Sequence, residues 1–166
     1  MIKYDENQVH YVTITGIIVR EGKYLIAKRA GWEKAFPGKW TVPGGKMKVL
    51  DYALRQKDVG VYWYNVLEDS LRREVKEEVN LEIKNIGYVT SMVYIRSDNI
   101  PCLIISLYAE PIDENPVKLC DALTEFAWVD LEEAKNYDLV EGIYEELVIL
   151  DNFLKKGNAM KWEKSS

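Results

Sequence analysis

Three glutamates on one predicted helix are the residues whose types and spacing could do chemistry. The stretch Leu67–Leu81 reads LEDSLRREVKEEVNL. At about 100° of rotation per residue, Glu74, Glu77 and Glu78 fall on one helical stripe. An apolar stripe lies beside them and consists of Leu67, Leu71, Val75 and Val79. Like charges at this spacing repel one another by about 0.2–0.5 kcal/mol per pair. A divalent cation such as Mg²⁺, which prefers carboxylate oxygens, would remove that repulsion. The pattern fits a metal site as well as a solvated charged face.

A glycine-rich segment upstream favours the metal site. Residues 38–46 read GKWTVPGGK, and their Pro43-Gly44-Gly45 turn carries backbone that no side chain covers. Such backbone can approach a helix or a ligand closely. The turn and the glutamate stripe are therefore interpreted together.

The two stretches together resemble the Nudix box. Its pattern is Gly, five residues, Glu, seven residues, and then Arg-Glu-apolar-x-Glu-Glu-x-Gly-apolar. Residues 73–81 match the second half at every defined position except the Gly, where Asn80 stands. Gly45 matches the leading Gly, and Trp40 and Pro43 match the usual lead-in.

The chain departs from the pattern between its two halves. Counting back eight positions from Arg73 ends at Asn65 where the pattern has Glu, and about residues 46–64 are interpreted as an insertion of 14 extra residues. We expect Asn65 to be a helix N-cap, with Glu68 completing a variant capping box. Asn80 is the next best residue to Gly for the left-handed conformation that ends a helix.

The resemblance implies a fold, a reaction and a set of site residues. The fold is of the α/β class, a Nudix-like α/β/α sandwich with a mixed sheet between helices. The reaction is hydrolysis of the diphosphate linkage in a nucleoside diphosphate joined to another group, with Mg²⁺, or alternatively Mn²⁺, as cofactor. The metal ligands are Gly45, Glu74, Glu77 and Glu78. The catalytic residues are the same three glutamates and Arg73, which either orients the carboxylates or simply pairs with Glu77.

Two further roles stay open at the level of sequence. Arg29 ends a predicted strand and could bind a substrate phosphate, although a plain surface charge is the favoured interpretation. The general base is Glu74, or an acid from a distant loop, Asp121 or Glu125.

The remaining elements follow from hydrophobic patterning and turn residues. The predicted strands are Val12–Arg20, Tyr24–Arg29, Glu82–Arg96, Ile100–Glu110 and Phe126–Val129. The predicted helices after the box are Leu131–Lys135 and Gly142–Lys156, the second with Ile143, Leu147, Leu150 and Leu154 on its packed face. We expect one domain over residues 1–166, with a polar tail from residue 157.

The insertion carries a helix-like piece, Leu50–Gln56, and three consecutive aromatic residues, Tyr62-Trp63-Tyr64. The aromatic side chains could stack on a nucleobase. They could also pack the insertion onto the body or onto a second subunit, which is the favoured interpretation.

Composition excludes several classes of protein. A net charge of −5 does not support a nucleic-acid surface. No apolar run approaches 18 residues, so no membrane span is expected. Two cysteines form no disulfide framework, and we expect a cytoplasmic protein with a nucleotide-type small-molecule substrate, compatible with a homodimer.

A catalytically silent, nucleotide-sensing module is the alternative function, and the intact glutamates argue against it. A prenyl-diphosphate isomerase is a further alternative, but no cysteine is placed for that chemistry.

Overall fold

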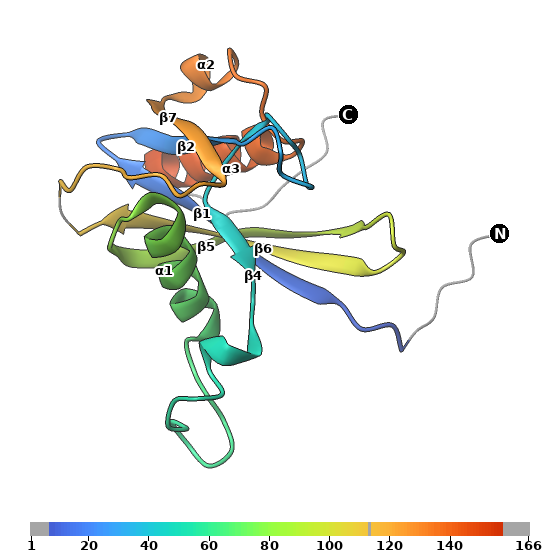
Figure 1. Cartoon of the computed structure of the whole chain (residues 1–166). Helices are drawn as coiled ribbons and strands as arrows, with labels where there is room; N and C mark the ends of the chain where they lie inside the picture. Colours follow the sequence, from blue (N-terminus) through green and yellow to red (C-terminus); the bar gives the residue numbers. More distant parts are fainter. Residues whose placement is uncertain (1–6, 113, 158–166) are drawn as a thin grey trace.

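The computed structural model describes residues 7–112 and 114–157. The predicted polar tail from residue 157 lies outside these ranges except for its first residue. Among the described residues, one mixed sheet lies between α1 (Val66–Val79) on one side and α3 (Ile143–Lys156) on the other (Figure 1). No helix of the described segments is both long enough and apolar enough to cross a membrane.

The sheet begins with a tight hairpin. Strands β1 (Tyr11–Arg20) and β2 (Lys23–Arg29) are joined by Glu21 and Gly22, both with positive φ of 50° and 75°. Two such residues form the turn whose twist matches antiparallel strands. These strands were predicted as Val12–Arg20 and Tyr24–Arg29, and in the structure each begins one residue earlier, at Tyr11 and Lys23.

Five more strands complete the sheet. They are β3 (Trp40–Thr41), β4 (Gly44–Lys46), β5 (Ile83–Ile95), β6 (Pro101–Pro111) and β7 (Leu123–Val129). The order is β3-β2-β1-β6-β5, with β4 paired to β1 and β7 paired to β2. Only the β1–β6 pairing is parallel among these, so the sheet is mixed as predicted.

Each face of the sheet has its own core. Side chains of α1, among them Leu71, Val75 and Val79, pack against Ile14 of β1 and Leu107 of β6. On the opposite face, Ile143, Leu147 and Leu150 of α3 pack against Ile17 and Val89. Leu154 is 46% exposed, so the prediction that it belongs to the packed face is wrong, because Phe153, one position earlier, packs against Tyr108 of β6 in this last turn.

The two ends of α1 behave differently. Asn80 has φ of 58° and its N–H donates to the Lys76 carbonyl, so the predicted left-handed helix end is confirmed. Asn65 also has a positive φ, 55°, and its side chain makes no capping hydrogen bond. A side-chain cap normally needs extended backbone at that position. The predicted capping box at Asn65 and Glu68 is therefore wrong.

The predicted helix Leu131–Lys135 begins with a side-chain cap at Asp130. Asp130 accepts a hydrogen bond from the Glu133 N–H, and the Glu133 side chain accepts one from the Asp130 N–H. This capping box starts the short helix α2 (Leu131–Ala134).

The insertion projects from the body between β4 and α1 (Figure 1). Its regular helical piece is the 3-10 turn η1 (Val49–Asp51), so the helix-like piece expected over Leu50–Gln56 starts one residue earlier and continues only as irregular turns. Arg55 organises the rest, with contacts to the Asp58 carboxylate and the Tyr64 carbonyl. The Trp63 indole N–H donates to the Arg55 carbonyl at 3.1 Å. Beyond η1, the insertion is therefore held together by hydrogen bonds to Arg55.

Candidate active site

The glycine turn and the glutamate helix meet as their sequences suggest. A Cβ placed on Gly45 would lie 2.3 Å from Glu74 Oε1, so a side chain at this position would displace the Glu74 carboxylate from the β4 backbone. The Gly44 N–H donates to Glu78 Oε2 at 2.9 Å. Strand β4 is fixed to the sheet by the pairing of Ile14 with Gly45. Backbone from one stretch therefore holds carboxylates from the other.

Arg73 joins two of the glutamates. Its Nη1 lies 2.7 Å from Glu74 Oε1 and 3.1 Å from Glu77 Oε2. Glu74 is 7% exposed, whereas Glu77 is exposed. The two sequence interpretations of Arg73, as orienting group and as i,i+4 partner of Glu77, are both consistent with this geometry.

The residue that holds Arg73 in place is Asp51, which the sequence interpretation missed. Arg73 Nε lies 2.7 Å from Asp51 Oδ1, and Nη2 lies 3.1 Å from Oδ2. This two-point pairing of a guanidinium with a carboxylate fixes both distance and orientation. Asn65, assigned to the Glu position of the box, is not the residue that contacts Arg73 here.

A simple count could have found Asp51. Six positions forward from Gly45, the spacing of the box, end at Asp51. The backward count from Arg73 fails because the extra residues lie between Asp51 and the helix. The acid of the first half of the box is thus present, shortened by one methylene.

Asp51 is firmly held as a carboxylate. Its side chain is 3% exposed and accepts hydrogen bonds from the Ser70 hydroxyl and the Lys48 N–H, both at 2.8 Å. Burial acts to raise the pKa of Asp51, but the bonds from Arg73, Lys48 and Ser70 outweigh it and the pKa is lowered. The charge that orients Arg73 is therefore retained at neutral pH.

The pKa of Glu78 is shifted in the opposite direction from that of Asp51. Burial raises the pKa of Glu78 to about 7, the nearby Glu74 and Glu77 charges add to the rise, and the Gly44 N–H and Arg29 oppose it. A half-buried carboxylate beside two others is the setting that a bound cation would relieve. In residues 7–112 and 114–157, however, no three acidic, histidine or cysteine side chains are grouped closely enough to hold an ion. Glu74 and Glu77 turn to Arg73, and Glu78 turns to Gly44. The donor chemistry therefore fits a divalent cation, and its binding requires these side chains to rotate.

Arg29 lies close to the site, but its side-chain hydrogen bonds are with the loop after β2 and not with Glu74, Glu77 or Glu78. Its charge lowers the pKa of Glu78, while Nη2 pairs with Glu33 at 3.0 Å and Nε donates to the Ala35 carbonyl at 2.6 Å. These bonds fix the loop after β2. The geometry is compatible with both the surface-charge and the phosphate-binding interpretation.

The two distant candidates for the general base differ in their surroundings. Asp121 is exposed in a loop whose Cys120 N–H donates to the Glu78 carbonyl at 3.0 Å. Glu125 lies on β7 and pairs with Lys28 at 2.7 Å. The structure therefore brings the Asp121 loop, rather than the Glu125 side chain, against the glutamate end of α1.

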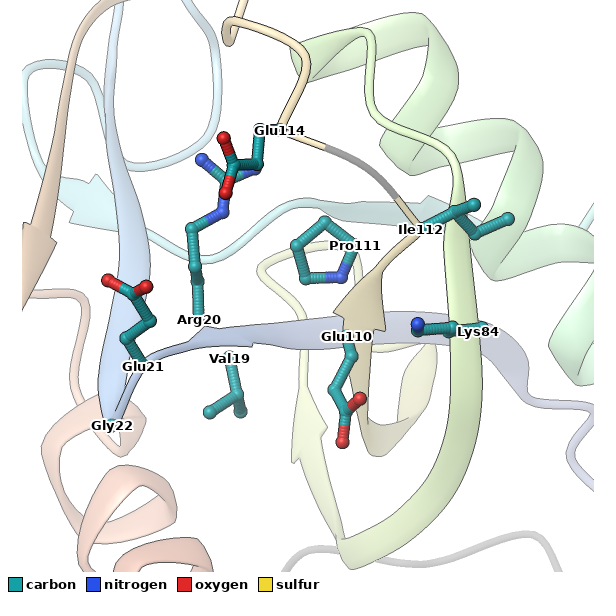
Figure 2. Close-up of a pocket in the computed structure, with 9 residues that line it drawn as sticks. All are labelled: Val19, Arg20, Glu21, Gly22, Lys84, Glu110, Pro111, Ile112 and Glu114. Carbon is teal, nitrogen blue, oxygen red and sulfur yellow. The ribbon is translucent and has the colours of Figure 1, made fainter.

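A separate pocket of about 430 Å³ lies at the other end of β1 (Figure 2). Its lining includes the β1–β2 turn, Lys84, Glu110, Arg20 and Glu114. None of the predicted site residues lines this pocket. The candidate active site is therefore placed by the box residues and not by this hollow.

Comparison with known proteins decides what this arrangement is. The family model described as NUDIX domain matches residues 10–148. The chain belongs to the NUDIX domain family. A relative, the nucleoside triphosphatase NudI of Klebsiella pneumoniae (strain 342), is 30% identical over 132 residues, which cover 74% of this chain and 84% of the relative. NudI of Escherichia coli (strain K12) is 27% identical over 135 residues, with the same coverage of both chains.

Solved structures show the same fold. The MutT NUDIX hydrolase from Burkholderia pseudomallei superposes with a TM-score of 0.66 at 19% identity, over 85% of this chain and 98% of that one. The NUDIX domain of Shewanella oneidensis NrtR, solved with ADP ribose, gives 0.63 at 13% identity, over 93% and 94%. These likenesses confirm the predicted α/β/α sandwich.

Family membership also confirms the predicted class of enzyme. The chain is a Nudix-type pyrophosphohydrolase, an enzyme that acts on phosphoanhydride bonds. Enzymes of this family generally depend on a divalent metal and take nucleotide-type small molecules.

Proposed function

We propose that this Nudix protein is a Mg²⁺-dependent hydrolase that cleaves the diphosphate linkage of a nucleoside diphosphate joined to another group. The observation that carries the proposal is the meeting of Glu74 and Glu78 with the Gly44-Gly45 backbone, while Arg73 joins Glu77 to Glu74. The carboxylates are intact, and one of them, Glu78, has a pKa raised by burial and by its acidic neighbours. A catalytically silent sensor would have no need for such a cluster.

Glu74, Glu77, Glu78 and the Gly45 carbonyl would hold the cation, for which Mn²⁺ is an alternative to Mg²⁺. When bound, a divalent cation neutralises phosphate oxygens and lowers the pKa of a water. The chain's own part is to hold the carboxylates for this purpose. Arg73, held by Asp51, positions Glu74 and Glu77 through distances of 2.7 and 3.1 Å.

Arg29 is proposed to meet a phosphate of the substrate. It lies near enough to Glu78 to affect its pKa, at the end of β2. A guanidinium can pair with a phosphate in two-point geometry. Binding would require Arg29 to exchange its bond with Glu33 for one with the substrate.

Of the three candidates for the general base, Asp121 is the one we favour. Glu74 is buried and paired with Arg73, and Glu125 is paired with Lys28. Asp121 is exposed, and its loop bonds to the end of α1. Asp121→Asn should lower kcat by about 100-fold, whereas Glu125→Gln, the matched control, should leave kcat unchanged. Equal effects of the two changes would remove Asp121 from this role.

Substrate identity is tested by a panel of nucleoside diphosphate derivatives incubated with Mg²⁺. The panel should include nucleoside triphosphates, because the NudI relatives are named nucleoside triphosphatases, together with nucleoside diphosphate sugars and dinucleotides. Chromatography of the products identifies the bond that is cleaved. We expect cleavage within the diphosphate linkage of at least one class. No cleavage of any compound by correctly folded protein would contradict the proposal.

A further inference from the structure

One edge of the sheet is formed by β5. In the strand order β3-β2-β1-β6-β5, it pairs with β6 on one side, and no strand in the described part of the chain pairs with it on the other. Register shifts between Lys84 and Gly87 and between Tyr88 and Thr90 interrupt the pairing with β6, but from Thr90 to Ile95 the pairing is regular. In this edge segment, Thr90–Ile95, the backbone N–H and C=O groups that point away from β6 therefore form a regular row without a strand partner.

The edge segment lies beyond both cores of the protein. Apolar residues in the first half of β5, as far as Val89, belong to the clusters on the two faces of the sheet, whereas no β5 residue after Val89 does. The end of the β5–β6 hairpin accordingly extends past α1 and α3 (Figure 1). Large apolar side chains are left in contact with water there, and the exposed fractions of Val93, Tyr94 and Ile95 are 54%, 43% and 52%.

The edge segment also lacks the features that keep most edge strands from pairing with another chain. Such strands are usually very short, or they carry charges, prolines or bulges. Residues 85–95 contain no charged residue and no proline. The register shifts interrupt the strand only before Thr90. The sequence of the edge segment, TSMVYI, is rich in β-branched and aromatic residues, which favour pairing in a sheet.

We propose that the edge segment is a homodimer interface, in which β5 of one copy pairs antiparallel with β5 of a second copy around a two-fold axis at Val93. An axis perpendicular to the sheet makes the two edge strands antiparallel and joins the two sheets into one, with both α1 helices on the same face. The inference does not depend on the proposed function, because no residue of the glutamate cluster takes part in the pairing.

The side chains of the edge segment are complementary to their own copies. With Val93 on the axis, the two Val93 side chains meet, and Ile95 lies opposite Ser91 on the same face of the joined sheet. On the other face, Tyr94 lies opposite Met92. Each exposed apolar side chain of the segment therefore meets an apolar or a small uncharged one.

No charge meets a like charge in this arrangement. Arg96, the first charged residue after the edge segment, comes opposite Thr90 and lies about 20 Å from the same arginine of the second copy. Salt screens exposed charges at that distance. Arg96 is also neutralised within its own chain, because Nη2 lies 2.9 Å from Asp98 Oδ2. An uncharged edge that matches itself favours a second copy of this chain over an unrelated strand.

The area of such an interface predicts a weak dimer. Six residues of strand span about 20 Å. Pairing over that length buries less than the roughly 800 Å² per partner of a standard interface. Because small interfaces are transient, the two copies should separate on dilution.

Sedimentation velocity of the full chain over a range of concentrations measures the association. Wild type should be dimeric at about 500 µM and monomeric at about 1 µM. Val93→Lys and Val93→Glu should each stay monomeric at the higher concentration, because two like charges would meet at the axis. An equimolar mixture of the two variants should dimerise again, because the lysine then faces the glutamate. Leu54→Lys, which changes an exposed apolar residue of the insertion, is the matched control and should behave as wild type.

Amide hydrogen exchange of wild type tests the same interface without a substitution. Residues 90–95 should exchange more slowly at the higher concentration, because pairing then protects their outward N–H groups.

Four results would overturn the inference. Wild type could be monomeric at every concentration, or its residues 90–95 could exchange equally fast at both. Leu54→Lys could dissociate a dimer that Val93→Lys leaves intact, which would assign the interface to the insertion. The mixture of the two Val93 variants could stay monomeric although each variant melts as wild type does, which would show that Val93 does not meet its own copy.

Discussion

At the scale of single residues, the site depends on a chain of contacts that ends in a buried acid. Arg73 touches Glu74 and Glu77, and Asp51 fixes Arg73 through two short bonds. Asp51 in turn is held by Ser70 and by the Lys48 backbone. Asp51 contacts no glutamate, so it acts on them through Arg73.

Loss of Asp51 should therefore impair catalysis more than binding. Asp51→Asn removes the charge that orients Arg73, and kcat should fall by about tenfold or more while KM stays nearly constant. Asp51→Glu restores the charge and the residue type of the box, and should recover most of kcat. Asp58→Asn, which alters an acid inside the insertion, is the control. An Asp51→Asn enzyme with wild-type kcat would exclude the positioning role.

The buried carboxyl of Glu146 should make the stability of the fold depend on pH. Its pKa is about 7 in the folded state against an ordinary value of 4.5. Between these values the folded protein binds more protons than the unfolded one, so stability falls as pH rises through this window. Above pH 7, the free energy of unfolding should be lower than at acidic pH by on the order of 3 kcal/mol from this residue.

Glu146→Gln removes this titration. Its melting temperature should exceed that of wild type at pH 8, and the difference should shrink at pH 5. Glu145→Gln should show no such pH-dependent difference. A Glu146→Gln protein that melts below wild type at pH 8 would mean that the ionised carboxylate is stabilised by the fold.

At the scale of elements, sequence reasoning succeeded where a pattern repeats. The long helices and the β1–β2 hairpin follow from apolar spacing over many residues and from one glycine turn. The insertion has no such repeat, and its shape comes from hydrogen bonds to Arg55 that no spacing rule reveals. The backward count to Asn65 failed for the same reason, since an irregular segment interrupts the motif.

Trp63 is the aromatic residue of the insertion that packs against other residues of the insertion. Its indole N–H donates to the Arg55 carbonyl, and its ring lies 5.4 Å from that of Tyr52. Trp63→Ala should therefore lower the melting temperature by several degrees, as a loss of about 1 kcal/mol would, with KM unchanged. Tyr62→Ala, at a side chain that is 64% exposed, is the control. A higher KM at an unchanged melting temperature would instead assign Trp63 to substrate stacking.

At the scale of the whole molecule, different residues lie on the two faces of the sheet, which α1 and α3 cover. The α1 face supplies the glutamates, and strand β4 presents Gly44 and Gly45 to them. On the α3 face, Glu146 is buried next to Ser106. The glutamate face could be predicted because its residues are contiguous in a motif. The burial of Glu146 next to Ser106 could not, because the docking of α3 on the sheet brings these two residues together from distant parts of the chain.

The central claim, that the box glutamates perform metal-dependent hydrolysis, is tested most directly by Glu78→Gln. The change keeps the shape of the side chain and removes its charge. With Mg²⁺ and a nucleotide that wild type cleaves, kcat should fall by about 10- to 100-fold, and excess EDTA should abolish wild-type turnover. Glu82→Gln, at an exposed acid paired with Lys76, should leave kcat unchanged. Full activity of Glu78→Gln, or of wild type in excess EDTA, would contradict the account.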